Sequence, residues 1–216
     1  MTPVDSQQRP CVSILFPDQY TVAAEVLGRA FVDDPLIKAI IPATTDAPER
    51  VRRMSGLFRV ILAGHRHDGQ PVLGVMDEGR VGAAAVVEQI SRPVGAMAAV
   101  LQGLPQLPAL VRATGWSGVM RALSVLDTLT RNRPAQPHIY LNILGVEPML
   151  QRRHFGVAIL DFLREQAALR SDLAGVYLET ATEANVAYYS HVGYRVIGEI
   201  YPLGVRMWRM MQDRAA

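Results

Sequence analysis

One stretch of the sequence, EPMLQRRHFGVAILDF at residues 147–162, carries most of the information about the fold. It predicts an apolar helix that opens with four polar residues, Gln151, Arg152, Arg153 and His154. A lone Gly156 follows them. The first turn of a helix leaves backbone N–H groups without partners and carries the positive end of the helix dipole, so it attracts anions. Segment 138–146 predicts a strand that would aim these groups at a ligand beyond its carboxyl end.

A phosphate-bearing cofactor and an ordinary solvated helix start explain this turn equally well when it is considered alone. Glycine at position 156 would let the backbone approach a ligand closely. No Gly-Lys-Ser/Thr follows, which excludes a Walker phosphate loop, and the glycine-rich dinucleotide fingerprint is missing as well. The remainder of the chain has to separate the two interpretations.

Hydrophobic periodicity along the chain predicts a mixed order of strands and helices. Strands are expected at 12–16, 71–76, 80–87, 138–146, 175–180, 194–200 and 205–211. Helices are expected at 20–31, 35–41, 47–67, 151–169 and 184–191, with a helical insertion at 93–132. The turn 77–79 joins two of the strands into a hairpin. Such an order implies an α/β sheet with parallel and antiparallel neighbours, in one domain spanning residues 1–216.

Composition excludes several classes of protein. Half of the 216 residues are hydrophobic, which predicts a folded chain, and 22 Lys and Arg against 20 Asp and Glu give a net charge of +2, too weak for a nucleic-acid binder. The uncharged segment 93–111 contains prolines, so two short helices are expected there rather than a membrane span.

Cys11 is alone, and the His65-x-His67 pair has no third ligand at suitable spacing, so neither a disulfide nor a metal site is expected. The N-terminus does not read as a secretory signal, and we expect a cytoplasmic protein.

The second half of the chain resembles the GNAT acyltransferase superfamily, whose members bind acetyl-CoA. The matching pieces are LNILGVEP at 141–148, QRRHFGVAIL at 151–160, VYLET at 176–180 and NVAYYSHVGYRVIGE at 185–199. The pattern is closest to the puromycin N-acetyltransferase-like branch, which shares a start similar to AFVDDP at 30–35. One position departs from the family loop pattern, because His154 stands where the first glycine is expected.

This resemblance implies a GNAT fold: a mixed, mostly antiparallel sheet of six to seven strands flanked by helices, with the helical insertion between the third and fourth strands. It implies acetyl-CoA as the acetyl donor, with its pyrophosphate over residues 151–156. The cofactor-binding residues that it implies are Leu144, Gly145, Val146, Gln151, Arg152, Arg153, His154, Phe155, Gly156, Val157, Ala158 and Asn185.

Transfer of acetyl to an amine needs a proton donor for the departing thiolate and a base for the amine. The resemblance assigns the donor role to Tyr189, for which the alternative is a half-buried aromatic side chain; Tyr188 is expected to pack. Glu179 is the candidate base, and a structural carboxylate bonded to a backbone turn explains it at least as well. Asn142 is a further polar group on an apolar strand, and Glu147 and His138 are minor candidates.

The resulting hypothesis is an acetyl-CoA-dependent N-acetyltransferase that acetylates a small, partly hydrophobic amine directly, without an acyl-enzyme. The apolar insertion would wall the acceptor site, or else cover the sheet or form a dimer face. The alternatives are an O-acetyl or longer-chain acyltransferase and a non-catalytic CoA-binding regulatory module. No nucleic acid, membrane or metal is expected as a partner, and a monomer and a homodimer are both compatible with the sequence.

Overall fold

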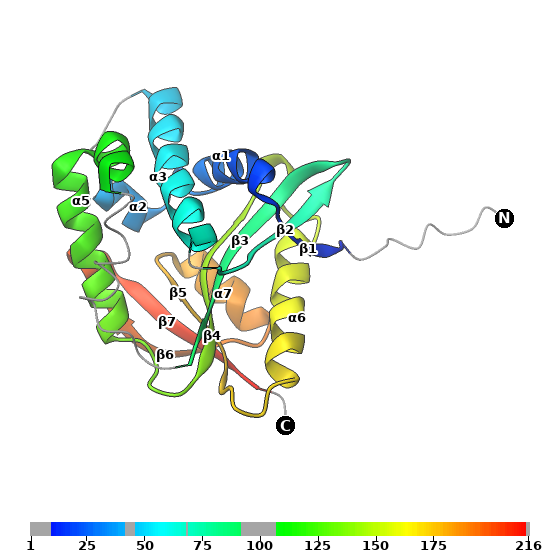
Figure 1. Ribbon diagram of the computed structural model, residues 1–216. Helices are drawn as coiled ribbons and strands as arrows, with labels where there is room; N and C mark the ends of the chain where they lie inside the picture. Colours follow the sequence, from blue (N-terminus) through cyan, green and yellow to red (C-terminus); the bar gives the residue numbers. More distant parts are fainter. Residues whose placement is uncertain (1–9, 42–45, 68, 92–106, 215–216) are drawn as a thin grey trace.

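The computed structural model describes residues 10–41, 46–67, 69–91 and 107–214 (Figure 1). Its strands are β1 (Val12–Ile14), β2 (Val72–Asp77), β3 (Arg80–Ile90), β4 (His138–Val146), β5 (Gly175–Thr180), β6 (Arg195–Ile200) and β7 (Met207–Asp213). Its helices are α1 (Tyr20–Ala30), α2 (Pro35–Ile40), α3 (Ala47–His67), α5 (Leu107–Arg131), α6 (Phe155–Ala168) and α7 (Glu183–His191). Three short 3-10 helices are η1 (Pro17–Gln19), η3 (Pro148–Leu150) and η4 (Pro202–Gly204).

The strands form one 7-stranded sheet in the order β1-β2-β3-β4-β5-β7-β6. Each pair of neighbours is antiparallel except β4 and β5, which run parallel. The α6 crossover connects that parallel pair, as parallel neighbours require. The sheet therefore confirms the expected α/β architecture with mostly antiparallel neighbours. Along the chain, α5 comes between β3 and β4.

The parallel pair comes apart partway along its length. β4 and β5 pair from Ile139 opposite Val176 to Leu141 opposite Leu178, and the pairing ends there. β4 continues to Val146 while β3 pairs with it on the other side, so the β5-facing edge of 142–146 has no strand beside it within the described residues. A wedge-shaped gap thus opens in the middle of the sheet.

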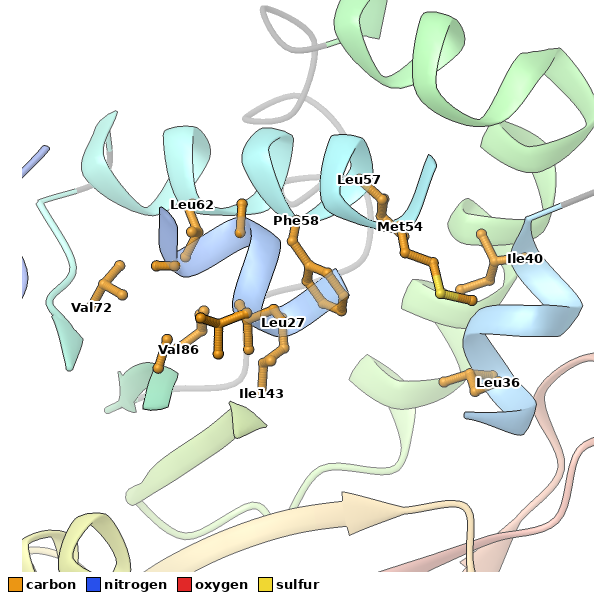
Figure 2. Packing of buried hydrophobic residues seen from close by; sticks show 14 of the residues in the cluster. Leu27, Leu36, Ile40, Met54, Leu57, Phe58, Leu62, Val72, Val86 and Ile143 are labelled. Atoms are coloured by element: carbon orange, nitrogen blue, oxygen red, sulfur yellow. The ribbon is translucent and has the colours of Figure 1, made fainter. Parts of the chain in front are cut away.

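One face of the sheet is covered by α1, α2, α3 and α5, and Figure 2 shows the packing there. Leu62 and Phe58 of α3 and Leu27 of α1 meet Val86 of β3 and Ile143 of β4. The α3 residues follow the three-four spacing that places apolar side chains on one side of a helix. Their burial holds the α1 and α3 pair against the strands that border the gap.

The opposite face is covered by α6 and, near the gap, by α7. Ile159, Leu160, Leu163 and Ala167 of α6 are each no more than 3% exposed. They pack with alternate residues of β3, β4 and β5, because successive side chains of a strand point to opposite faces. This packing fixes the start of α6 at the carboxyl end of β4.

Two sequence expectations need correction or restriction. The helix expected at 151–169 begins at Phe155, and residues 151–154 form a separate turn, because Arg152 and His154 adopt left-handed conformations that a helix cannot continue through. The insertion at 93–132 is confirmed for α5, which is interrupted at Gly115, whereas residues 93–106 lie outside the described residues. In the described part of the chain, no helix is both long and apolar enough to cross a membrane.

Candidate functional site

A cavity of about 340 Å³ lies on the α5 side of the gap. Its walls are mostly apolar side chains of α2, α3 and α5, and its floor consists of residues from the separating ends of β4 and β5. Five of the residues singled out in the sequence line it together: Asn142, Leu144, Glu179, Asn185 and Tyr189. The fold therefore gathers into one cavity residues from β4, β5 and α7, which lie far apart in the sequence.

The start of α6 presents a run of free backbone donors. The N–H groups of residues 152–157 have no hydrogen-bond acceptor within the described part of the chain, and the first helical bond runs from Ala158 N–H to the His154 carbonyl. Gln151 N–H donates to the Pro148 carbonyl at 3.4 Å, so it is not part of the run. No acidic residue occupies the first turn of α6. Six adjacent donors at a helix start form a strong anion-binding arrangement.

The departure at His154 has a conformational explanation. His154 has φ 63° and ψ 11°, a left-handed conformation, and Arg152 has φ 66°. Glycine adopts this conformation without steric cost, whereas other L-residues pay about 1–2 kcal/mol. The turn therefore takes the backbone shape that a glycine favours, although a histidine stands at the position.

The side chains of this turn differ in what they contact. The Arg153 guanidinium pairs with Asp77 at 3.1 Å and lies 5.6 Å from the centre of the Phe155 ring. Arg152 and Gln151 have exposed side chains. Phe155 is 6% exposed, so it offers a ligand its backbone N–H rather than its ring. Arg152 is thus the arginine of the turn that remains available to an anion.

Gly156, in the first turn of α6, faces α7 and the end of β4. A Cβ added there would be 3.0 Å from the Tyr188 hydroxyl of α7 and 3.7 Å from Val146 at the end of β4. A side chain at 156 would consequently crowd the space between α6, α7 and β4. Tyr188 is 38% exposed, and its ring packs against the Tyr189 ring with 5.3 Å between the ring centres.

The end of β4 supplies backbone groups and packing together. A Cβ at Gly145 would meet Leu27 at 2.7 Å and Ala30 at 3.1 Å, so the glycine allows α1 to cross closely over the strand. Leu144 and Val146 are half-buried. Because peptide groups of a strand point alternately to its two sides, some N–H and C=O groups of 142–146 face the gap.

Glu179 lies at the floor of the cavity in a network of polar side chains. The Tyr177 hydroxyl donates a hydrogen bond to Glu179 Oε1 at 2.8 Å. Burial raises the pKa of Glu179 to about 7, although the hydrogen bond from Tyr177, the nearby Tyr140 hydroxyl and the charges of Arg133 and Arg209 act to lower it. The partner of this carboxylate is a phenol rather than the backbone turn that the structural alternative required. A carboxyl group with a pKa near neutrality is suited to accept a proton.

Tyr189 lies within the gap itself. Its ring packs with the cluster on the α6 face, 5.7 Å from the centre of the Tyr194 ring, while the residue also lines the cavity on the α5 face. Burial raises the pKa of its phenol, so the hydroxyl keeps its proton. None of the described side chains forms a hydrogen bond with that hydroxyl.

Sequence reasoning missed the groups that surround Glu179. Tyr177 is fully buried, and Arg209 Nε donates to its hydroxyl at 3.4 Å. Tyr140 is covered by the Arg133 guanidinium, 4.1 Å from the ring centre. The sequence does carry one signal of this pairing: Tyr177 and Glu179 are two positions apart on one strand and therefore share a face.

The two minor base candidates have other partners. Glu147 forms a bidentate ion pair with Arg29 of α1, with distances of 2.8 to 3.1 Å between the guanidinium nitrogens and the carboxylate oxygens. His138 is fully buried at the start of β4, and its Nδ1 lies 2.7 Å from the Gln136 carbonyl. Asn142 is likewise engaged, since it donates to Glu88 at 3.1 Å and accepts from Tyr140 at 3.3 Å.

Solved structures of acetyltransferases superpose on nearly the whole chain. A protein of Corynebacterium glutamicum described as histone acetyltransferase HPA2 and related acetyltransferase matches with a TM-score of 0.70 at 20% identity, over 97% of this chain and 98% of that one. A GCN5-related N-acetyltransferase of Rhodopseudomonas palustris matches with a TM-score of 0.55 at 13% identity, over 95% and 96%. The chain has the GNAT fold.

Other proteins with the GNAT fold act on different acceptors. The ribosomal-protein-S18-alanine N-acetyltransferase of Escherichia coli gives a TM-score of 0.55 at 15% identity, over 95% of this chain and 94% of that one. A mosquito arylalkylamine N-acetyltransferase like 5b gives 0.54 at 12%, over 93% and 97%. No protein-family model matches the chain. The described residues contain no group of three or more His, Cys, Asp or Glu that could hold a metal ion.

Proposed function

We propose that the chain is an acetyl-CoA-dependent N-acetyltransferase that passes acetyl directly to the amine of a small, partly hydrophobic acceptor. One observation carries the proposal: the gap between β4 and β5 has six free N–H groups at one end and Glu179 at its floor. The first feature suits a diphosphate and the second an amine. The GNAT fold and its acetyltransferase neighbours support the same assignment.

The donor would lie along the open edge of β4. Its pyrophosphate would accept hydrogen bonds from the amides of residues 152–157, with Arg152 adding charge, and its pantetheine arm would pair with 142–146 as an added strand does. Asn185 of α7, which is exposed and lines the cavity, would bond to that arm. Gly156 leaves the turn open for the diphosphate.

The reaction would then need three groups of this chain. Glu179 takes the proton from the acceptor ammonium or attacking amine, whose nitrogen forms a bond to the thioester carbon. A backbone N–H on the open edge of β4 stabilises the charge that develops on the carbonyl oxygen. The C–S bond breaks, and Tyr189 donates its proton to the departing thiolate. The low-polarity surroundings that keep Tyr189 protonated also penalise a bare thiolate, which favours this transfer.

The cavity predicts the class of acceptor. Its apolar walls from α2, α3 and α5 suit an aliphatic or aromatic body, and its volume of about 340 Å³ suits a small molecule rather than a folded partner. The amine of such an acceptor would reach Glu179 at the floor.

A mass-spectrometric search for acetylated products tests the proposal. The protein is incubated with acetyl-CoA and a mixture of aryl and alkyl amines, alcohols and amino acids, while thiol release is followed in parallel. Acetylated amines are expected, and both signals should fall in Tyr189→Phe and Glu179→Gln. Acetylated alcohols, or release with longer acyl-CoA donors alone, would contradict the assignment of acetyl and amine. Binding of acetyl-CoA without release across the mixture would favour a regulatory module.

A further inference from the structure

We propose that Tyr177, itself held by Arg209, positions the Glu179 carboxylate to accept the proton of the acceptor amine. This inference rests on the proposed function, and it adds to it a residue that does not touch either substrate. Tyr177 is therefore a positioning residue. The contacts of its hydroxyl carry the argument.

The hydroxyl of Tyr177 connects Glu179 to a fixed cation. It donates to Glu179 Oε1 at 2.8 Å, and it accepts from Arg209 Nε at 3.4 Å. A phenol has one proton to donate, and Arg209 can only donate. The Tyr177 oxygen therefore accepts from Arg209, and its own proton is donated to the carboxylate. Arg209 lies opposite Glu179 in the β5 and β7 register, so the sheet itself sets this arrangement.

The ring of Tyr177 has no freedom to move away. Tyr177 is 0% exposed, and its ring is packed by Tyr140 at 5.8 Å and His138 at 5.4 Å between ring centres. Glu179 is half-buried and lines the cavity. Oε1 is thereby fixed by an immobile donor on the sheet, which leaves the second carboxylate oxygen for an amine in the cavity.

The groups that face Glu179 come from four elements. Tyr177 shares β5 with it, Tyr140 faces it from β4, Arg209 from β7, and Arg133 from the segment after α5. Arg133 also lies 3.6 Å from Glu88, which offsets part of its charge. Tyr177 is the member with a short direct hydrogen bond to the carboxylate, and its removal should consequently have the largest effect.

Tyr177 does not relay the proton that Glu179 receives. Burial raises the pKa of the Tyr177 phenol far above its ordinary value, so it stays a hydrogen-bond donor throughout the reaction. The proton must leave Glu179 through the cavity. The pair thus works as one base whose charged form Tyr177 stabilises.

The test is the titration of Glu179 in Tyr177→Phe, followed by NMR of protein with ¹³C-labelled glutamate side chains, with Glu179→Gln used to assign the signal. The phenylalanine keeps the ring and removes the donor. Because the variant loses a charge-assisted hydrogen bond that stabilises the charged form, the pKa of Glu179 should rise from about 7 to about 8 or higher. Arg209→Gln should raise it less and serves as a second variant if Tyr177→Phe does not fold.

Kinetics supply the second readout. In Tyr177→Phe the acidic limb of kcat/KM for acetyl transfer should move upward, which lowers the rate about fivefold at pH 7 and leaves it nearly unchanged at pH 9. Tyr201→Phe is the matched control, because the exposed Tyr201 hydroxyl donates to Glu199 at the same 2.8 Å, two positions away, outside the cavity. That variant should leave the pH profile unchanged.

The outcomes separate this inference from the proposed function. An unchanged Glu179 titration in both variants overturns the role of Tyr177, whatever the activity. An equal loss of rate at all pH values, without movement of the limb, would assign Tyr177 a structural role and also refute the inference. If no amine is acetylated at all, the proposed function fails, while the titration still reports whether Tyr177 controls the carboxylate.

Discussion

Replacement of Glu179 by glutamine should change the pH dependence of folding stability, independently of any catalytic role. The folded protein holds the pKa of Glu179 at about 7, against an ordinary value of 4.5. Because the folded state binds this proton more tightly than the unfolded state, the group favours folding at acidic pH. Its contribution is lost progressively as the pH rises from the unfolded pKa to the folded pKa.

The magnitude follows from linkage. Between pH 5 and pH 8.5, a carboxyl group with these two pKa values lowers the free energy of unfolding by about 2.5 kcal/mol. Glutamine has nearly the same shape and no titration, so Glu179→Gln lacks this loss. The variant should therefore gain about 2.5 kcal/mol relative to the original protein on going from pH 5 to pH 8.5, in addition to any constant offset from altered hydrogen bonds.

Urea unfolding at the two pH values measures this difference, and other titrating groups cancel because they are common to both proteins. Glu199→Gln is the control: Arg206 and Tyr201 lower the pKa of that exposed carboxyl, so its replacement should not produce a relative gain at high pH. A difference between Glu179→Gln and the original protein that is equal at both pH values would refute the reasoning. It would mean that water or a conformational change relieves the buried charge.

Three further predictions concern the gap. Tyr189→Phe should slow acetyl transfer at least tenfold while the dissociation constant of acetyl-CoA in calorimetry stays within about twofold, since proton donation acts in the transition state; unchanged turnover would remove Tyr189 from this role. Gly156→Val should weaken acetyl-CoA binding at least tenfold, because a Cβ there lies 3.0 Å from the Tyr188 hydroxyl and a branched side chain would crowd the space between α6, α7 and β4. Ala168→Val, at the exposed far end of the same helix, is its control, and equal affinities of the original protein and Gly156→Val would contradict the assigned binding site. His154→Gly should raise the free energy of unfolding by up to about 1 kcal/mol, because it removes the backbone strain at φ 63°. Chemical denaturation measures this change, and a loss of stability would show that the histidine side chain makes a compensating contact.

The fold was predictable from local sequence because each element carries its own periodicity. The strand expected at 138–146 and the helix expected at 47–67 coincide with β4 and α3. The four pieces between residues 141 and 199 that together resemble the GNAT superfamily then predicted how these elements are arranged. Periodicity could not place the start of α6, since a polar run reads the same in a helix as in the turn that precedes one.

The candidate site was predictable only where its residues belong to local motifs. Tyr189, Asn185 and Leu144, which were assigned from such motifs, line the same cavity, while the roles assigned to them stay predictions. The sequence left two explanations open for Glu179, because its pKa depends on burial and on partners distant in the sequence, such as Arg133 after α5. Likewise, the pairing of Arg153 with Asp77 depends on how the β2 and β3 hairpin lies against α6.

The divergence of β4 from β5 has a consequence for the protein without its ligand. A sheet ordinarily exposes unsatisfied peptide groups along its two outermost strands, whereas this one adds an inner edge at 142–146, where the amides that point away from β3 can bond to solvent. Those amides should exchange with deuterium quickly although they lie on a central strand. A thin, flexible chain bound along this edge would slow that exchange and join both halves of the sheet into one hydrogen-bonded unit.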